Sequence, residues 1–227
     1  MSRILAVTRM HLTDRLTLFT LPPAILASSF LVNMLIFAKE PVDSRTTGGA
    51  AAIYCVVFVA AVMCTARGVT FALSMGASRR AFALGTGLVG ALLAVTFGIF
   101  MLVLNRIEMA TGGWWLHGQF FAPLWFAHND LAAIWLILTL PFLATFLLGA
   151  WVSTIWLRWK TVGMLVGGVV AVLVLGGLAV LATWLDAWAS VGHWFAHLTP
   201  LSASGWVALL CLPLAGASYL VLRRLAL

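Results

Sequence analysis

Long apolar runs separated by short charged segments dominate this chain of 227 residues. A helix needs about 20 apolar residues to cross the roughly 30 Å hydrocarbon core of a bilayer. Six runs reach this length, over about residues 16–38, 49–73, 81–105, 131–157, 161–185 and 203–222. Each should be helical, because lipid offers no partner to a free backbone N–H or C=O. We therefore predict an all-α, polytopic fold with six transmembrane helices in a single transmembrane domain, 1–227.

The stretch 109–129 is also free of charges, but its composition is that of a loop. It contains Gly112-Gly113, Pro123 and several polar side chains. Its aromatic residues suit the belt at a membrane–water interface. These are Trp114, Trp115, Phe120, Phe121, Trp125 and Phe126. We expect an outer loop with short interfacial or re-entrant helices here, not a seventh span.

The distribution of basic residues gives an orientation. With six spans, ten lysines and arginines fall on one side of the membrane and three on the other. The ten are Arg3, Arg9, Arg15, Arg67, Arg79, Arg80, Arg158, Lys160, Arg223 and Arg224, and the three are Lys39, Arg45 and Arg106. Basic residues are enriched on the cytoplasmic side, so both ends are predicted to be cytoplasmic and residues 1–15 to form a cytoplasmic interfacial segment.

The composition indicates that the chain is surrounded by membrane lipid, and it argues against nucleic acid as a partner. The chain is 63% hydrophobic and 8% charged, whereas a soluble domain carries roughly 25% charged residues. The net charge of +7 is spread over the ends of apolar runs and is not gathered in one basic patch.

Few residues inside the spans carry obvious chemistry. No acidic or basic residue lies in the middle of a span, so an ion-driven pump is not favoured. Ser28, Ser29 and Asn33 could line a substrate path, or they could join packed helices by hydrogen bonds. The three cysteines (Cys55, Cys64, Cys211) have no metal-site spacing and are expected to be small core residues.

A histidine pair raises one alternative. His193 and His197 are four residues apart and would share a helix face, which could bind a metal together with His117 or His128. No general base follows the pattern of a zinc protease, so we expect no metal and no catalytic residue. An outer-face metal-dependent membrane enzyme stays open as an alternative function.

The segment between the second and third spans has the clearest local signal. Residues 66–82 read ARGVTFALSMGASRRAF. Gly76 can adopt the left-handed conformation that ends a helix, and Ser78 can cap the next helix. The result should be a short, ordered projection into the cytoplasm.

This segment resembles the intracellular turn of permeases of the ABC-2 type, a family of ABC-transporter transmembrane subunits. These often show a Leu-Gly-x-Ser-Arg-Arg-like sequence, which here reads Met75-Gly76-Ala77-Ser78-Arg79-Arg80. The family also has six spans, a basic segment before the first span and a re-entrant outer element before the sixth. This chain resembles that plan in its six predicted spans, in residues 2–15 and in residues near 186–200. The stretch 106–130 is longer and more aromatic than the family pattern.

The resemblance implies a permease subunit of the bacterial cytoplasmic membrane that exports a hydrophobic or amphipathic substrate. The turn would be a coupling helix that contacts a cytoplasmic ATP-binding subunit through Ser74, Met75, Gly76, Ala77, Ser78, Arg79 and Arg80. ATP and magnesium would be bound by that partner, and a second permease subunit would complete the transporter. The alternative without transport is an accessory or immunity membrane protein.

Overall fold

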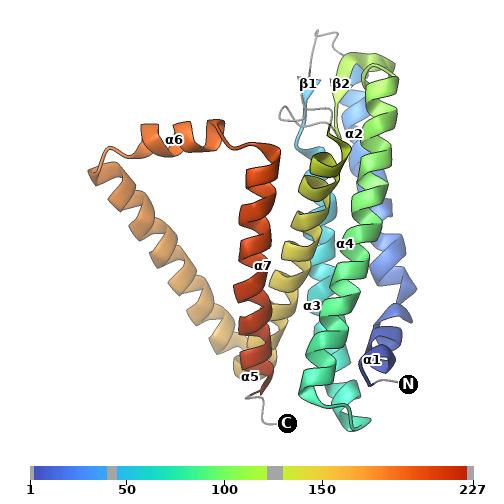
Figure 1. Ribbon diagram of the computed structural model, residues 1–227, viewed down its shortest axis with the longest axis vertical. Helices are drawn as coiled ribbons and strands as arrows, with labels where there is room; N and C mark the ends of the chain where they lie inside the picture. The colour runs from blue at the N-terminus through green and yellow to red at the C-terminus, as the bar shows by residue number, and fades with distance from the viewer. Residues whose placement is uncertain (1–2, 40–44, 122–129, 224–227) are drawn as a thin grey trace.

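The computed structural model describes residues 3–39, 45–121 and 130–223, and this part of the chain is all-α (Figure 1). Five of its helices are long and apolar enough to cross a membrane, so the chain is a multi-pass membrane protein. The elements in order are α1 (Arg3–Leu12), a π-helical turn (Leu16–Thr20), α2 (Leu21–Lys39), β1 (Arg45–Thr46), a 3₁₀ turn (Gly49–Ala51), α3 (Ala52–Ser74), α4 (Arg79–Ala110), a left-handed turn (Gly113–His117), β2 (Gly118–Gln119), α5 (Leu131–Trp184), α6 (Trp188–Ala196) and α7 (Pro200–Arg223).

Four of the predicted spans each match one helical segment, and the other two lie together in α5. This element has 54 residues and is interrupted at Lys160, whose φ of 53° and ψ of −140° are not helical. Figure 1 shows that the chain reverses its direction partway along α5, near the bottom of the view. We call residues 131–159 the first limb and 161–184 the second limb. The short connection predicted between the fourth and fifth spans is thus a kink of a single residue.

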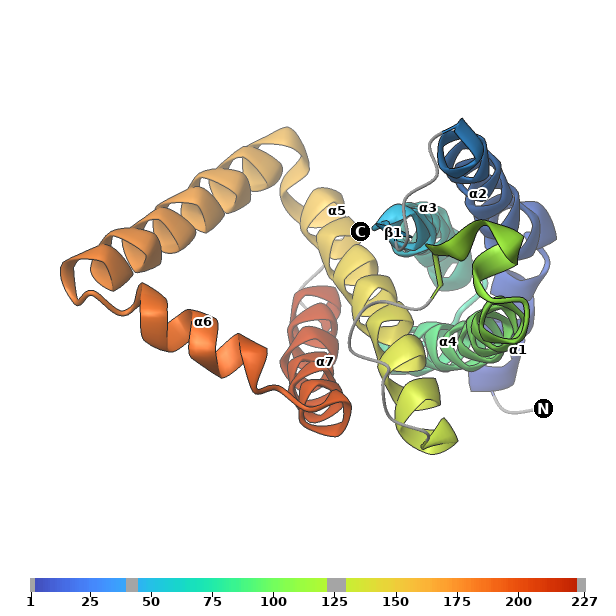
Figure 2. The same cartoon turned by 90° about the horizontal axis from the view of Figure 1, so that it is seen from above.

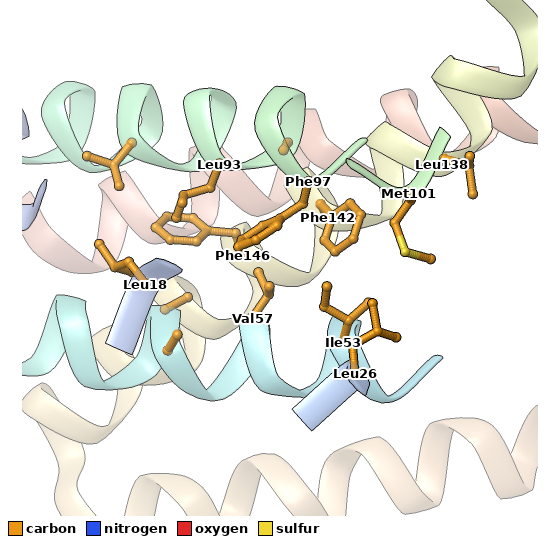
Figure 3. Close-up of a cluster of buried hydrophobic side chains, with 14 of the residues drawn as sticks. Leu18, Leu26, Ile53, Val57, Leu93, Phe97, Met101, Leu138, Phe142 and Phe146 are labelled. Atoms are coloured by element: carbon orange, nitrogen blue, oxygen red, sulfur yellow. The ribbon is translucent and has the colours of Figure 1, made fainter. Parts of the chain in front are cut away.

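The core lies between α2, α3, α4 and the first limb of α5 (Figure 3). The rings of Phe97 and Phe142 are tilted to each other with centroids 5.6 Å apart, and the centroid of the Tyr54 ring lies 4.4 Å from that of Phe142. Glycines allow the helices to approach closely, because a Cβ at Gly90 would meet the Phe146 ring. Glycine on α4 therefore leaves room for an aromatic ring of α5 at this contact.

The second limb and α6 stand away from this core. Nearly every described residue from 162 to 195 is exposed. Figures 1 and 2 show the second limb, α6 and α7 as three sides of a triangle, with α7 returning to pack against the first limb. In Figure 1, α6 runs crosswise at one end of the molecule, which agrees with a short interfacial helix.

The opposite end carries α1, the α3–α4 turn, the kink in α5 and the end of α7 (Figure 1), and we call it the basic end. Here α1 packs on α4 through a small apolar cluster. Its buried members are Val7, Val69, Ala72, Phe82 and Leu222. The segment before the first span is thus fixed to the helix body and is not a loose surface segment.

Candidate functional site

The α3–α4 turn has the capped geometry that its sequence predicts. Gly76 has a φ of 77°, its N–H donates to the Leu73 carbonyl (3.0 Å), and the Ala77 N–H donates to the Ala72 carbonyl (2.9 Å). These two bonds form a Schellman motif, which ends α3. Ser78 then caps α4, since its Oγ accepts from the Ala81 N–H at 3.2 Å. Both expected roles, for Gly76 and Ser78, are confirmed.

The turn does not contain a helix of its own, and its role as a coupling element toward an ATP-binding subunit stays a prediction. Only residues 75–78 connect α3 to α4. A Schellman motif followed at once by an N-cap leaves no room for a further helical turn. The tip is nevertheless open: Met75 is 74% exposed, and Ser74, Gly76 and Ser78 are exposed beside it.

The two arginines of the turn differ in their surroundings. Arg79 is partly buried, and its Nη1 donates to the carbonyl of Arg223 at 2.7 Å, which ties the start of α4 to the end of α7. Arg80 is exposed and makes no hydrogen bond or ion pair with a described residue. Of the two arginines, Arg80 is therefore the more accessible to an outside group.

A hollow of about 300 Å³ lies beside the turn, between it and α1. Arg3 and Met10 contribute one wall, and Phe71, Met75 and Ala77 contribute the other. Its lining combines exposed apolar side chains with a basic residue. The turn and α1 therefore present one continuous surface at the basic end.

A buried histidine joins α1 to this region, and the sequence did not single it out. His11 Nε2 lies 3.0 Å from Thr86 Oγ1, and His11 Nδ1 lies 2.8 Å from Cys64 Sγ. Burial lowers the pKa of His11 to about 4. Cys64 is thus a hydrogen-bonded residue as well as a small core residue. The available signal was a lone histidine on the apolar face of a short basic helix.

The polar residues predicted to line a substrate path lie along α2. Ser29 Oγ donates to the Gly49 carbonyl at 3.1 Å, and Asn33 Oδ1 accepts from Thr47 Oγ1 at 2.8 Å. Ser28 is exposed and donates to the Ile25 carbonyl of its own helix. Ser29 and Asn33 therefore join α2 to the segment that precedes α3, and a role in substrate passage stays a prediction.

The histidine pair of α6 has a close geometry. His193 Nε2 and His197 Nε2 are 3.0 Å apart, and both histidines line a hollow together with Trp194, Ser202 and Trp206. No third histidine, cysteine or carboxylate joins them within the described residues. The side chain of His117 and all of His128 lie outside the described part. The geometry alone therefore does not build the metal centre of the alternative function.

The aromatic loop after α4 is largely part of the core, which corrects the expectation of an interfacial belt. Phe120 and Phe121 are buried, and Phe120 lies 5.3 Å from Phe30 of α2. Trp115 is 79% exposed and fits the expectation. Trp125 and Phe126 lie outside the described residues. The described part of the loop, through Phe121, consists of the left-handed turn and the two-residue strand β2. It contains no short surface helix.

A buried carboxylate organises this loop. Glu108 accepts from the Trp114 Nε1–H at 2.8 Å and from the backbone N–H groups of Phe120 (3.0 Å) and Phe121 (3.0 Å). Asn105, one turn earlier, donates to the Phe121 carbonyl at 3.1 Å. The loop therefore folds back onto the end of α4.

Neither a protein-family model nor a curated protein nor a solved structure matches this chain.

Proposed function

We propose that this chain is the transmembrane permease subunit of an ATP-binding-cassette transporter of the ABC-2 type. It would export a hydrophobic or amphipathic substrate across the bacterial cytoplasmic membrane, while a separate subunit binds and hydrolyses ATP. The observation that carries this proposal is the α3–α4 turn: a rigid, doubly capped and exposed tip at the basic end. Such a tip can transmit a push from a docked protein into two long helices at once.

The orientation supports this role. The second limb of α5 is long enough to cross the membrane separately, since 24 residues span about 36 Å. Counting both limbs gives six crossings with both ends on one side. The bias of basic residues then makes that side cytoplasmic, where an ATPase subunit would meet the turn and α1.

A second permease subunit is part of the proposal. The second limb of α5 is exposed on all sides, and a Cβ at Gly167, Gly168, Gly176 or Gly177 would meet nothing within 4 Å. Small residues allow another helix to pack closely in lipid. This limb is therefore the surface we assign to the neighbouring subunit.

The test is capture of the ATPase subunit with matched variants. Tagged full-length chain is purified from its native membrane, and copurifying proteins with a P-loop are identified and assayed for ATP hydrolysis. Met75→Asp, at the tip, should reduce copurification about tenfold or more, because an interface core rarely accepts an unpaired charge. Met109→Asp, at an exposed site of the opposite end, should leave it unchanged. Absence of any P-loop partner, or transport by the purified chain alone in vesicles, would refute the proposal.

A further inference from the structure

A cavity of about 630 Å³ lies between α3, α4, the first limb of α5 and α7. Along α4 it extends from Arg80 to Leu88, a rise of about 12 Å. It opens to the side, because Leu84 and Leu88 line it and are 49% and 38% exposed. Its volume falls within the roughly 300–1,000 Å³ of small-molecule sites.

The walls are mainly apolar, with hydroxyl groups among the apolar side chains and one charged side chain at one end. Alanine, leucine and phenylalanine side chains make up most of the lining, and no described acidic residue contributes to it. Arg80 lines the end nearest the α3–α4 turn, with its charge unpaired among the described residues. A long apolar space that ends at one free guanidinium matches a molecule with an acyl chain and an anionic head.

Two hydroxyl groups in the wall lack partners. Thr65 on α3 and Ser218 on α7 both line the cavity and are buried. Neither hydroxyl oxygen has a hydrogen-bond partner within the described part of the chain. Buried hydroxyls are nearly always hydrogen-bonded, so these two groups are polar positions of the wall that no described residue satisfies.

We propose that this cavity binds an anionic phospholipid from the membrane leaflet at the basic end. One acyl chain lies between α4 and α7, and the phosphate contacts Arg80. The cytoplasmic leaflet supplies such lipids, and its anionic surface attracts basic residues. The proposal requires that the chain is embedded in a membrane with the basic end on the cytoplasmic side. It is independent of any ATPase subunit.

Binding of defined lipids to the full-length chain tests the proposal. Native mass spectrometry in an uncharged detergent compares phosphatidylglycerol with phosphatidylcholine of the same acyl chains. We expect one phosphatidylglycerol bound about fivefold to tenfold more tightly. Arg80→Gln should abolish this preference. Arg79→Gln should retain it, because Arg79 donates to the Arg223 carbonyl and does not line the cavity. Both arginine variants keep the apolar core intact.

A variant that fills the cavity distinguishes lipid binding inside the cavity from attraction of lipid to the charged surface. Ala215→Phe places a ring in the cavity from α7 and should remove tight binding of both lipids, with folding checked by thermal unfolding. Equal affinity of the wild type for the two lipids would overturn the proposal. So would an unchanged preference in Arg80→Gln, or full displacement of the lipid by inorganic phosphate. These readouts do not involve ATP, so they fail or succeed separately from the proposed function.

Discussion

Glu108 holds the loop after α4 by accepting hydrogen bonds from three N–H groups with one buried carboxylate. Glu108→Gln keeps the shape but replaces one acceptor oxygen with a donor. All three donors reach Oε2, and the Phe121 N–H also lies 3.1 Å from Oε1, so in the variant this N–H meets the amide NH2 and the charge assistance to all three bonds is lost. We expect a loss of about 1.5–3 kcal/mol in stability. Hydrogen exchange of peptide 111–121 should quicken, and the unfolding temperature in detergent should fall.

The control for Glu108→Gln is Asp186→Asn, which removes the same charge at an exposed position beside α6. It should change neither measurement. Equal exchange in the two variants would mean that the loop is held by its aromatic packing and not by the carboxylate.

His11 makes the docking of α1 sensitive to acid. Burial lowers its pKa from 6.5 to about 4, so the undocked state binds the proton first as the pH falls. The stabilisation is complete above pH 6.5 and is lost progressively between pH 6.5 and about 4. The total loss is about 3 kcal/mol. Hydrogen exchange of residues 3–12, corrected for its intrinsic pH dependence, should rise over this range.

His11→Gln provides the comparison, since glutamine fills a similar volume and does not titrate. In this variant the exchange of residues 3–12 should be faster at neutral pH and nearly flat between pH 6.5 and 5. A wild-type profile that is equally flat would show that His11 is not the group that couples α1 to pH.

The helices α4 and α5 approach each other closely because α4 presents glycine at the contact. A Cβ at Gly98 would overlap the Thr139 side chain and lie 3.1 Å from Thr139 Cα. We therefore expect Gly98→Ala to lower stability by about 1–3 kcal/mol. Gly87→Ala on the same helix meets nothing within 4 Å and should be neutral or stabilising. Thermal unfolding in detergent compares the two. Equal effects would exclude close packing as the cause.

The sequence predicted elements well where the signal was local. Gly76 and Ser78 end one helix and begin the next through bonds within a few residues, so residue type alone indicates them. The predicted third span ended at residue 105, but α4 continues to Ala110. The charges of Arg106 and Glu108 suggested a loop there, whereas Glu108 is buried and accepts hydrogen bonds from N–H groups of the loop that follows.

Contacts between distant segments could not be predicted from the sequence. His11 and Cys64 are 53 positions apart, and nothing in either neighbourhood specifies the other. Phe120 and Phe121 have the composition of an interfacial belt, because an aromatic ring suits both an interface and a core. The cavity beside Arg80 was likewise hidden, since it needs residues from four helices.

The membrane topology of the whole chain depends on whether α5 crosses the membrane once or twice. A straight helix of 54 residues would measure about 81 Å, far more than the roughly 30 Å of hydrocarbon. The left-handed backbone at Lys160 divides it into two limbs of sufficient length, and Arg158 and Lys160 mark the kink as a membrane boundary. Two crossings by α5 put the end of α7 on the same side as α1. One crossing would put these two ends on opposite sides.

Single-cysteine labelling in intact cells decides between these arrangements. In a background with Cys55, Cys64 and Cys211 replaced by serine or alanine, we expect Ser190→Cys on α6 to react with a membrane-impermeant maleimide. Thr13→Cys and Ser74→Cys at the basic end should react only after the cells are opened. A cysteine at Trp159, which is 45% exposed next to the kink, should behave like Ser74→Cys. Labelling of that site from outside would contradict six crossings, because the kink would then face away from the cytoplasm and the ten basic residues would no longer share one side.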